Sequence, residues 1–183
     1  MIKRVSYLSE ASAKLLVPDQ SVAMVSITER SREASLSGVE GWGALLRVHF
    51  SDAEYDEQML ARLKARGKVF DVEAKGFPSR RSSETIRAFL VRISDDPTIT
   101  ELVVHCHAGQ RRSAAVAKFA SEMYGASFDH SYSGYNRTVY ALLRTPALYE
   151  RPGPVDRLRD LLKAVKRAMG LGTASHGNVL KGE

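Results

Sequence analysis

The sequence predicts a single α/β domain with a central, mostly parallel sheet of about four or five strands flanked by helices. Short apolar runs rich in β-branched residues alternate along the chain with segments whose apolar residues recur at helical spacing. That alternation is typical of a parallel sheet covered by helices. The length of 183 residues suits one domain, and a composition of 44% hydrophobic and 26% charged residues is ordinary for a globular protein.

The expected strands are short and apolar, and each lies between turn or loop signals. The run from Val22 to Ile27 has the β-branched composition of a buried strand. The four expected strands cover residues 3–8, 22–27, 44–50 and 101–105. Residues 69–72 could form a fifth short strand or a segment that covers the core, and the sequence leaves both readings open.

The expected helices follow the strands. Ser9 is a candidate N-cap for the first helix, and Gly67 and Gly125 can end two later ones. The six expected helices cover residues 10–16, 53–65, 83–93, 112–124, 137–144 and 154–169. The helix over 112–124 is apolar around most of its circumference, which predicts that it is buried. We therefore expect one domain over residues 1–169, followed by a flexible tail over 170–183.

The net charge and the cysteine content indicate which partners and which cellular compartment suit the protein. The formal net charge is +6, which favours anionic partners such as phosphorylated molecules. Cys106 is the single cysteine, so an internal disulfide is excluded, and one thiol suits a reducing compartment. No apolar stretch is long enough to predict a membrane span, and no signal peptide is recognisable near the start. We expect a soluble, cytoplasmic protein without internal repeats.

The loop that follows the strand over 101–105 carries the strongest chemical signal. Ligands of parallel α/β sheets bind beyond the carboxyl ends of the strands. Here Cys106 follows the strand, Gly109 allows a turn and Arg112 begins a helix. The N–H groups of a loop and helix N-terminus attract an anion, and an arginine adds a planar fork of donors. The same surroundings stabilise a thiolate, so the loop predicts a cysteine nucleophile beneath a bound tetrahedral anion.

The residues of this loop also match a known pattern. Cys106 and Arg112 have the spacing of the Cys-x5-Arg loop, and His105, Gly109 and Ser113 complete the motif His-Cys-x-x-Gly-x-x-Arg-Ser/Thr. The sequence resembles the compact dual-specificity and bacterial or phage-like branch of the protein tyrosine phosphatase superfamily. The resemblance covers about residues 101–140, including the segment 135–140, which some bacterial members share.

Three loop residues depart from the common form of the motif. The position before the arginine is usually small, and Arg111 occupies it here. His107 and Gln110 are also unusual. The stretch 53–81 is long for a compact member, which leaves the general acid open.

The resemblance implies a phosphotyrosine protein phosphatase II-like fold and a mechanism without metal or cofactor. Cys106 would attack phosphorus and form a phosphocysteine, Arg112 would hold the phosphate oxygens, and Ser113 would ease departure of the sulfur. The phosphate-binding residues would be His107, Ala108, Gly109, Gln110, Arg111 and Arg112. The substrate would be a phosphomonoester, with protein phosphotyrosine favoured and dual specificity open. Phosphoinositide and RNA phosphates also stay open.

An aspartate after a strand would supply the proton to the leaving group. Asp52 directly follows the expected strand over 44–50 and is the first candidate, with Asp56 and Asp71 as alternatives. Taken alone, an aspartate at such a position is more often a helix N-cap than an acid. The role of Asn136 also has two readings: its side chain could form a hydrogen bond near the loop, or it could cap the helix over 137–144.

Other readings of the same residues remain. His105 and His107 flank the cysteine, but alternate strand residues point apart and no second ligand cluster is visible, so we expect no metal. The rival functions are a catalytically inactive phosphate-binding module and a rhodanese-type sulfurtransferase or arsenate reductase, although the reductase lacks a resolving thiol. We find no clear signal for nucleic acid or membrane partners, and the oligomeric state is open.

Overall fold

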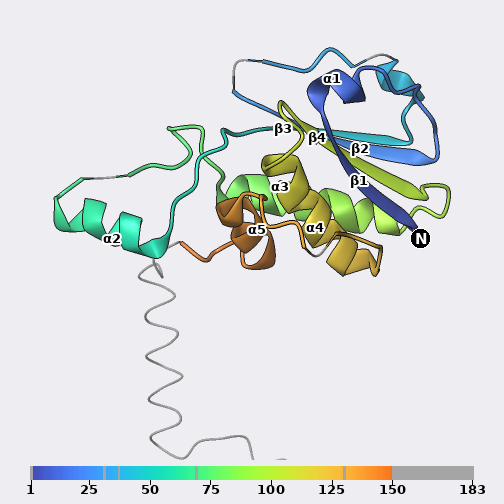
Figure 1. The fold of residues 1–183 in the computed structure, drawn as a ribbon. Coiled ribbons are helices and arrows are strands. Elements are labelled where there is room, and N and C mark those ends of the chain that lie inside the picture. The colour runs from blue at the N-terminus through green and yellow to red at the C-terminus, as the bar shows by residue number, and fades with distance from the viewer. Residues whose placement is uncertain (1, 31, 37, 69, 130, 150–183) are drawn as a thin grey trace, which may run out of the picture. The chain divides into compact units, whose positions relative to one another are not determined.

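The sheet is fully parallel and has four strands. The computed structural model describes residues 2–149 except 31, 37, 69 and 130. The strands are β1 (Arg4–Ser9), β2 (Val22–Thr28), β3 (Ala44–His49) and β4 (Glu101–Cys106), in the spatial order β1-β4-β2-β3 (Figure 1). The prediction of an α/β fold with a parallel sheet of four or five strands is therefore confirmed.

Strand β4 occupies the interior of the sheet, between β1 and β2. Its last residue, Cys106, is in register with Ser9 of β1, and His105 is in register with Leu8 on one side and Ser26 on the other. Because all the strands run in one direction, their carboxyl ends meet at one edge of the sheet. The loop that begins at Cys106 leaves from the middle of that edge.

Three helices differ from the predicted ones: the second and third at their starts, and the first at its end, which lies at Ala13 and not at residue 16. The described helices are α1 (Glu10–Ala13), α2 (Glu57–Ala65), α3 (Arg80–Ser94), α4 (Arg112–Tyr124) and α5 (Arg137–Arg144), with a 3-10 turn η1 (Val39–Gly41). Helix α2 begins later than predicted because the Asp56 carboxylate caps it by accepting from the N–H of Met59. Helix α3 begins earlier because Ser79 and Ser82 form a reciprocal capping box.

The stretch between α2 and α3 covers part of the core and does not add a strand. Residues 72–76 form turns, and the Asp71 carboxylate accepts hydrogen bonds from the N–H groups of Glu73 and Ala74. Phe70 and Phe77 pack against Tyr55 at ring-centroid distances of 6.3 Å each. Of the two readings of residues 69–72, the described part of the chain thus supports the covering segment.

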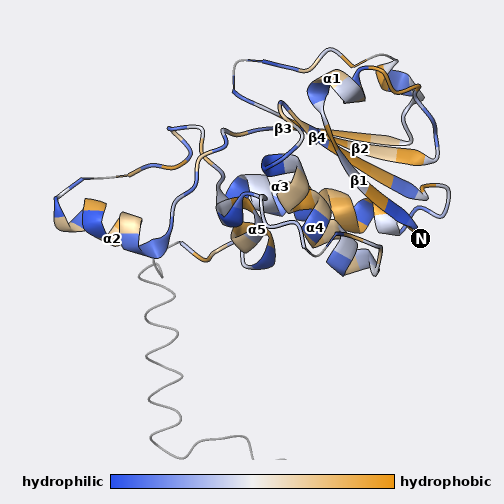
Figure 2. Cartoon of the chain, viewed as in Figure 1, coloured by the Kyte–Doolittle hydropathy of each residue, from blue (hydrophilic) through white to orange (hydrophobic). Residues whose placement is uncertain are grey.

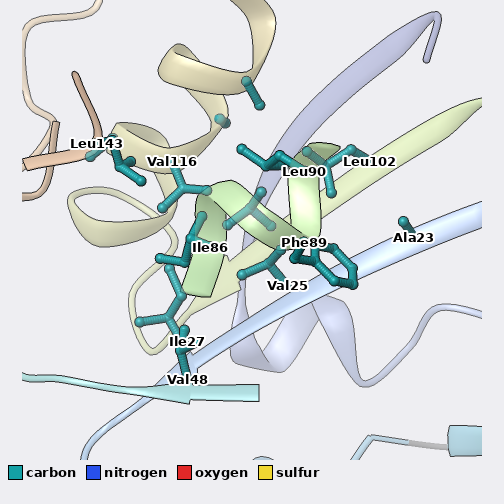
Figure 3. Close-up of a cluster of buried hydrophobic side chains, with 14 of the residues drawn as sticks. Ala23, Val25, Ile27, Val48, Ile86, Phe89, Leu90, Leu102, Val116 and Leu143 are labelled. Atoms are coloured by element: carbon teal, nitrogen blue, oxygen red, sulfur yellow. The ribbon is translucent and has the colours of Figure 1, made fainter. Parts of the chain in front are cut away.

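The main hydrophobic core lies between one face of the sheet and helices α3, α4 and α5. Side chains of the two layers meet there, and the apolar strands stand out in the hydropathy colouring (Figures 2 and 3). Its members include Val25, Ile27, Leu90, Val116 and Leu143. Helix α4 buries the small residues on it, as predicted for a helix that is apolar around most of its circumference.

The opposite face of the sheet carries a smaller core. Met24 and Val103 point to this side and pack with Ala13 of α1 and with Leu36 and Trp42 of the segment between β2 and β3. No helix of the described residues is long and apolar enough to cross a membrane. The predicted helix over 154–169 and the predicted tail lie outside the described residues.

Candidate active site

The loop between β4 and α4 surrounds the sulfur of Cys106 with hydrogen-bond donors. The Ser113 hydroxyl lies 3.2 Å from Sγ, and both residues are buried. Burial alone would raise the pKa of the Cys106 thiol. Hydrogen bonds from the Ser113 hydroxyl and from the backbone N–H groups of Ser113, Gln110 and Gly109 outweigh it, so the pKa lies below that of an ordinary cysteine. The loop is therefore built to hold a thiolate.

Helix α4 presents its first turn to this loop. The N-cap residue Arg111 makes no side-chain capping bond, so the first N–H groups of the helix are not capped in that way. Arg112, at the first helical position, is 5% exposed, and its Nη1 donates to the carbonyl oxygen of Phe50 at 2.7 Å. This bond ties the guanidinium to the residue that follows β3.

Gly109 lets the loop approach the junction of β1 and α1. Its φ is +67°, and a Cβ atom at this position would lie 2.2 Å from the backbone nitrogen of Ser9. A hydrogen bond from the N–H of Glu10 to the carbonyl oxygen of His107, 3.3 Å long, joins the same two segments. The motif glycine is thus required both by the backbone conformation and by the space.

A cavity of about 230 Å³ opens beside the loop. It is lined by Thr28, Glu29, Arg32, His107 and Arg112. All five lining residues are polar, and two of them are arginines. Thr28 ends β2 and Arg112 starts α4, so the cavity lies at the carboxyl edge of the sheet, where the sequence predicted a ligand.

Buried Glu10 organises the charged wall of this cavity. Its carboxylate accepts from Arg32 and pairs with Lys14 at 2.9 Å, while His107 Nδ1 lies 3.8 Å away. Burial raises the pKa of Glu10, but the contacts with Lys14 and Arg32 prevail and lower it overall. Arg32 is half exposed and so keeps part of its guanidinium toward the cavity.

His105 lies on the other face of β4 from Cys106. It is fully buried, and neither ring nitrogen has a hydrogen-bond partner. Burial, helped by the positive charges of Arg47 and Lys14 and opposed by Glu10, lowers the pKa of His105 to about 4. The ring is neutral at physiological pH, so His105 contributes to the packing behind the loop and carries no charge there.

Asp52 lies three residues beyond the end of β3, where it meets the loop and α5. Its Oδ2 is 3.0 Å from Nε of Arg111, and its Oδ1 accepts from Nδ2 of Asn136 at 2.8 Å. Asn136 also caps α5, because its Oδ1 accepts from the N–H of Val139. The two readings of Asn136 are both correct: the same side chain caps the helix and bonds beside the loop.

The other two candidates, Asp56 and Asp71, stabilise local structure away from the loop. Asp56 caps α2, and Asp71 stabilises the turn at residues 72–76. Neither has a hydrogen bond or ion pair with residues 106–113 among those recorded for the described chain. Of the three candidates for the general acid, Asp52 alone is joined to the loop by a side-chain contact within that part.

The remaining loop residues lie at the surface. Ala108 and Gln110 are exposed, and the Gln110 carbonyl accepts from the Tyr132 hydroxyl at 2.9 Å. The Arg111 side chain points away from the cavity wall toward Asp52 and Glu54. Arg112 and His107 therefore line the cavity, while the Arg111 guanidinium faces carboxylates.

Sequence reasoning did not single out Thr28, Glu29, Arg32 or Glu10. The position of Thr28 at the end of a buried strand was an available signal, because strand ends line such sites. Nothing in the sequence marked Arg32 or Glu10 as functional, because charged residues are common in polar loops and in the first turns of short helices.

Comparisons with known proteins place no further constraint on the site. The chain matches no protein-family description and no curated protein. Among solved structures it is similar to human DUSP28, at 18% identity and a TM-score of 0.28, with 90% of this chain and 88% of that chain covered. A variant of human DUSP28 gives 18% identity and a TM-score of 0.30, with 90% and 91% covered. Because these TM-scores are low, the function of the protein must be inferred from the site alone.

Proposed function

We propose that this protein is a cysteine-dependent phosphatase that hydrolyses phosphomonoesters, with protein phosphotyrosine as its substrate. The observation that carries the proposal is the surroundings of Cys106. Hydrogen bonds from the Ser113 hydroxyl and the loop N–H groups lower the pKa of its thiol, and the buried Arg112, which follows the loop, lines a cavity at the same end of the sheet. A thiolate next to donors for a tetrahedral anion is suited to attack on phosphorus.

In the first step, the Cys106 thiolate forms a bond to phosphorus while the bond from phosphorus to the ester oxygen breaks. Arg112 and the loop N–H groups bind the three equatorial oxygens, where charge is concentrated in the transition state. Asp52 delivers a proton to the departing oxygen, so that a neutral alcohol or phenol leaves.

In the second step, water attacks the phosphocysteine. Asp52, now a carboxylate, accepts a proton from that water, the bond from sulfur to phosphorus breaks and inorganic phosphate leaves. The Ser113 hydroxyl, 3.2 Å from the sulfur, stabilises the returning thiolate. The cycle consumes one water for each ester and requires no metal or redox partner.

The decisive experiment is a rapid-mixing assay with p-nitrophenyl phosphate. We expect a burst of p-nitrophenol equal to the enzyme concentration, followed by slower steady turnover, because p-nitrophenol leaves readily and hydrolysis of the phosphocysteine then limits the rate. Cys106→Ser should abolish turnover but still bind vanadate or phosphate. Near-normal turnover by that variant would exclude the mechanism.

The same assay separates the rival functions. Absence of turnover together with tight phosphate binding would identify an inactive phosphate-binding module. Formation of thiocyanate from thiosulfate and cyanide would identify a sulfurtransferase. Peptides with phosphotyrosine should be hydrolysed faster than matched phosphoserine peptides; the reverse order would retain the chemistry and reject the proposed substrate.

A further inference from the structure

Arg111 links the loop between β4 and α4 (residues 107–111), the phosphate loop of the proposed mechanism, to the segment that carries Asp52. Its Nε lies 3.0 Å from Oδ2 of Asp52, and its Nη2 lies 2.9 Å from Oε1 of Glu54. One planar guanidinium thus bridges two carboxylates that are two residues apart. Arg111 directly precedes Arg112, so a movement of the phosphate loop would be transmitted to both carboxylates.

The start of α5 completes this link from the other side. The buried Asn136 donates to Asp52 Oδ1 at 2.8 Å and to the Ala53 carbonyl at 3.2 Å, and its own N–H donates to the carbonyl of Arg111 at 3.0 Å. The N–H of Arg137 donates to Oε1 of Glu54 at 2.9 Å. Three segments distant in the sequence therefore meet at Arg111.

The segment around Asp52 depends on such contacts for its position. Residues 51–56 belong to neither a helix nor a strand. Backbone bonds hold the two sides of Asp52: the N–H of Ser51 donates to the Gly76 carbonyl at 2.8 Å, and the N–H of Tyr55 donates to Thr138 Oγ1 at 2.9 Å. Within the described chain, residues 52–54 contact the loop through the ion pairs that Arg111 makes with Asp52 and Glu54.

The strength of the link suits a group that must change its protonation. Arg111 and its two partners are each between one third and one half exposed. Ion pairs with that exposure are weak, so this link can open and close during a reaction cycle. The buried amide of Asn136 does not titrate and holds the second oxygen of Asp52 throughout.

We propose that Arg111 is a positioning residue for the general acid, a role that rests on the proposed function. When Asp52 is a carboxylate, it accepts from both Arg111 and Asn136. A proton on Oδ2 makes that oxygen a donor toward the leaving oxygen and weakens its pairing with Arg111, because the negative charge of Asp52 is lost. Glu54 then retains the guanidinium beside the loop until the proton has gone to the leaving oxygen and Asp52 can rebind.

The test compares Arg111→Ala, Arg111→Lys and a matched control. Arg80→Ala is the control, because Arg80 is also half exposed and also pairs with a glutamate, at 2.7 Å, but lies on α3. Phenyl phosphate needs protonation of its leaving group, whereas p-nitrophenyl phosphate needs little. We expect Arg111→Ala to lower kcat on phenyl phosphate about 10–100-fold and to change kcat on p-nitrophenyl phosphate and both KM values less than about 3-fold. Arg111→Lys, which can keep one ion pair, should recover most of the loss.

Hydrogen exchange of the peptide over residues 50–56 gives a readout that does not require turnover. Exchange should be faster in Arg111→Ala and unchanged in Arg80→Ala. Equal losses of kcat on the two phosphates, or a raised KM alone, would show that Arg111 binds substrate directly and would overturn the proposal, as would unchanged exchange. A wild-type protein with neither burst nor turnover would instead refute the proposed function, and exchange would still report whether the link exists.

Discussion

At the scale of single residues, the guanidinium of Arg112 combines a structural contact with the phosphate binding that we propose. Its Nη1 donates to the Phe50 carbonyl, and the rest of the group borders the cavity. A lysine has the charge but not the planar fork, so it cannot keep the Phe50 bond and bind two phosphate oxygens together. We expect Arg112→Lys to lower kcat/KM about 10²–10³-fold, measured with p-nitrophenyl phosphate.

The adjacent Arg111→Lys serves as the control for that measurement. Its side chain faces carboxylates, so on p-nitrophenyl phosphate it should retain most of the wild-type rate. A larger loss in Arg111→Lys than in Arg112→Lys would contradict the assignment of Arg112 as the residue that binds phosphate.

Asp52 provides a second prediction at the residue scale. Asp52→Asn keeps the shape and removes the proton donor, so hydrolysis of phenyl phosphate or phosphotyrosine should slow about 10²–10⁴-fold, with a much smaller effect on p-nitrophenyl phosphate. Asp56→Asn is a good control because asparagine also caps helices well. If Asp56→Asn or Asp71→Asn gave the leaving-group-dependent loss instead, the general acid would lie in the long stretch after β3.

At the scale of elements, the phosphate loop packs directly on the end of β1. Gly109→Ala would place a methyl group 2.2 Å from the Ser9 nitrogen and would also strain a φ of +67°. We expect a loss of about 2–5 kcal/mol in the free energy of unfolding, from the left-handed conformation and the overpacking together. Urea denaturation measures it.

Gly125→Ala is the control for Gly109→Ala, because it carries the same conformational cost without the steric clash. Gly125 follows α4 with a φ of +68°, and nothing lies within 4 Å of an added Cβ. It should cost only the conformational part, about 1–2 kcal/mol. Equal losses in the two variants would mean that the loop moves away from β1 at little cost.

The elements also show how far the sequence predicts the fold. The parallel strands and the order of helices were predicted, because apolar periodicity and β-branched runs are local signals. The starts of α2 and α3 were misplaced, since several polar residues near each start could cap it and packing decides which does. For example, the N-cap of α3 is Ser79 and not Ser82, because the two serines form a reciprocal pair of capping bonds.

For the candidate site too, the sequence predicts the residues of one local motif but not the contacts between distant segments. Cys106, Ser113 and Arg112 were predicted together because their spacing is itself the signal; the structure places the Ser113 hydroxyl 3.2 Å from the Cys106 sulfur and Arg112 at the cavity. The contacts of Arg111 with Asp52 and Glu54, and of Arg32 with Glu10, join charged surface residues of distant segments. No spacing or periodicity encodes such pairs, so only the packed structure reveals them.

At the scale of the whole molecule, buried His105 should make stability depend on pH. Its folded pKa of about 4 lies below the ordinary value of 6.5, so the folded state resists protonation. The stabilisation is fully present above pH 6.5 and is lost as the pH falls from 6.5 to about 4, because the unfolded state takes up the proton first. The difference corresponds to about 3 kcal/mol.

His105→Asn removes this titration. Glu10, whose pKa is lowered, also loses stabilising contacts in acid, so the comparison must be a difference between the two proteins. We expect the unfolding free energies of wild type and variant, measured in urea at several pH values, to converge by about 3 kcal/mol between pH 6.5 and 4. Parallel curves would show that the His105 ring is solvated when the protein is folded.

The strand order has a consequence for synthesis on the ribosome. Strands β1 and β2 each pair with β4 and not with one another, and the Arg4–Glu101 contact spans 97 positions of the chain. A nascent chain must therefore carry β1 unpaired until β4 has left the exit tunnel, and contacts of such long range form slowly. A chain interrupted before α4 would expose unpaired strand edges and lack the donors that ionise Cys106. Incomplete chains would thus be prone to aggregate but would not carry a reactive thiolate.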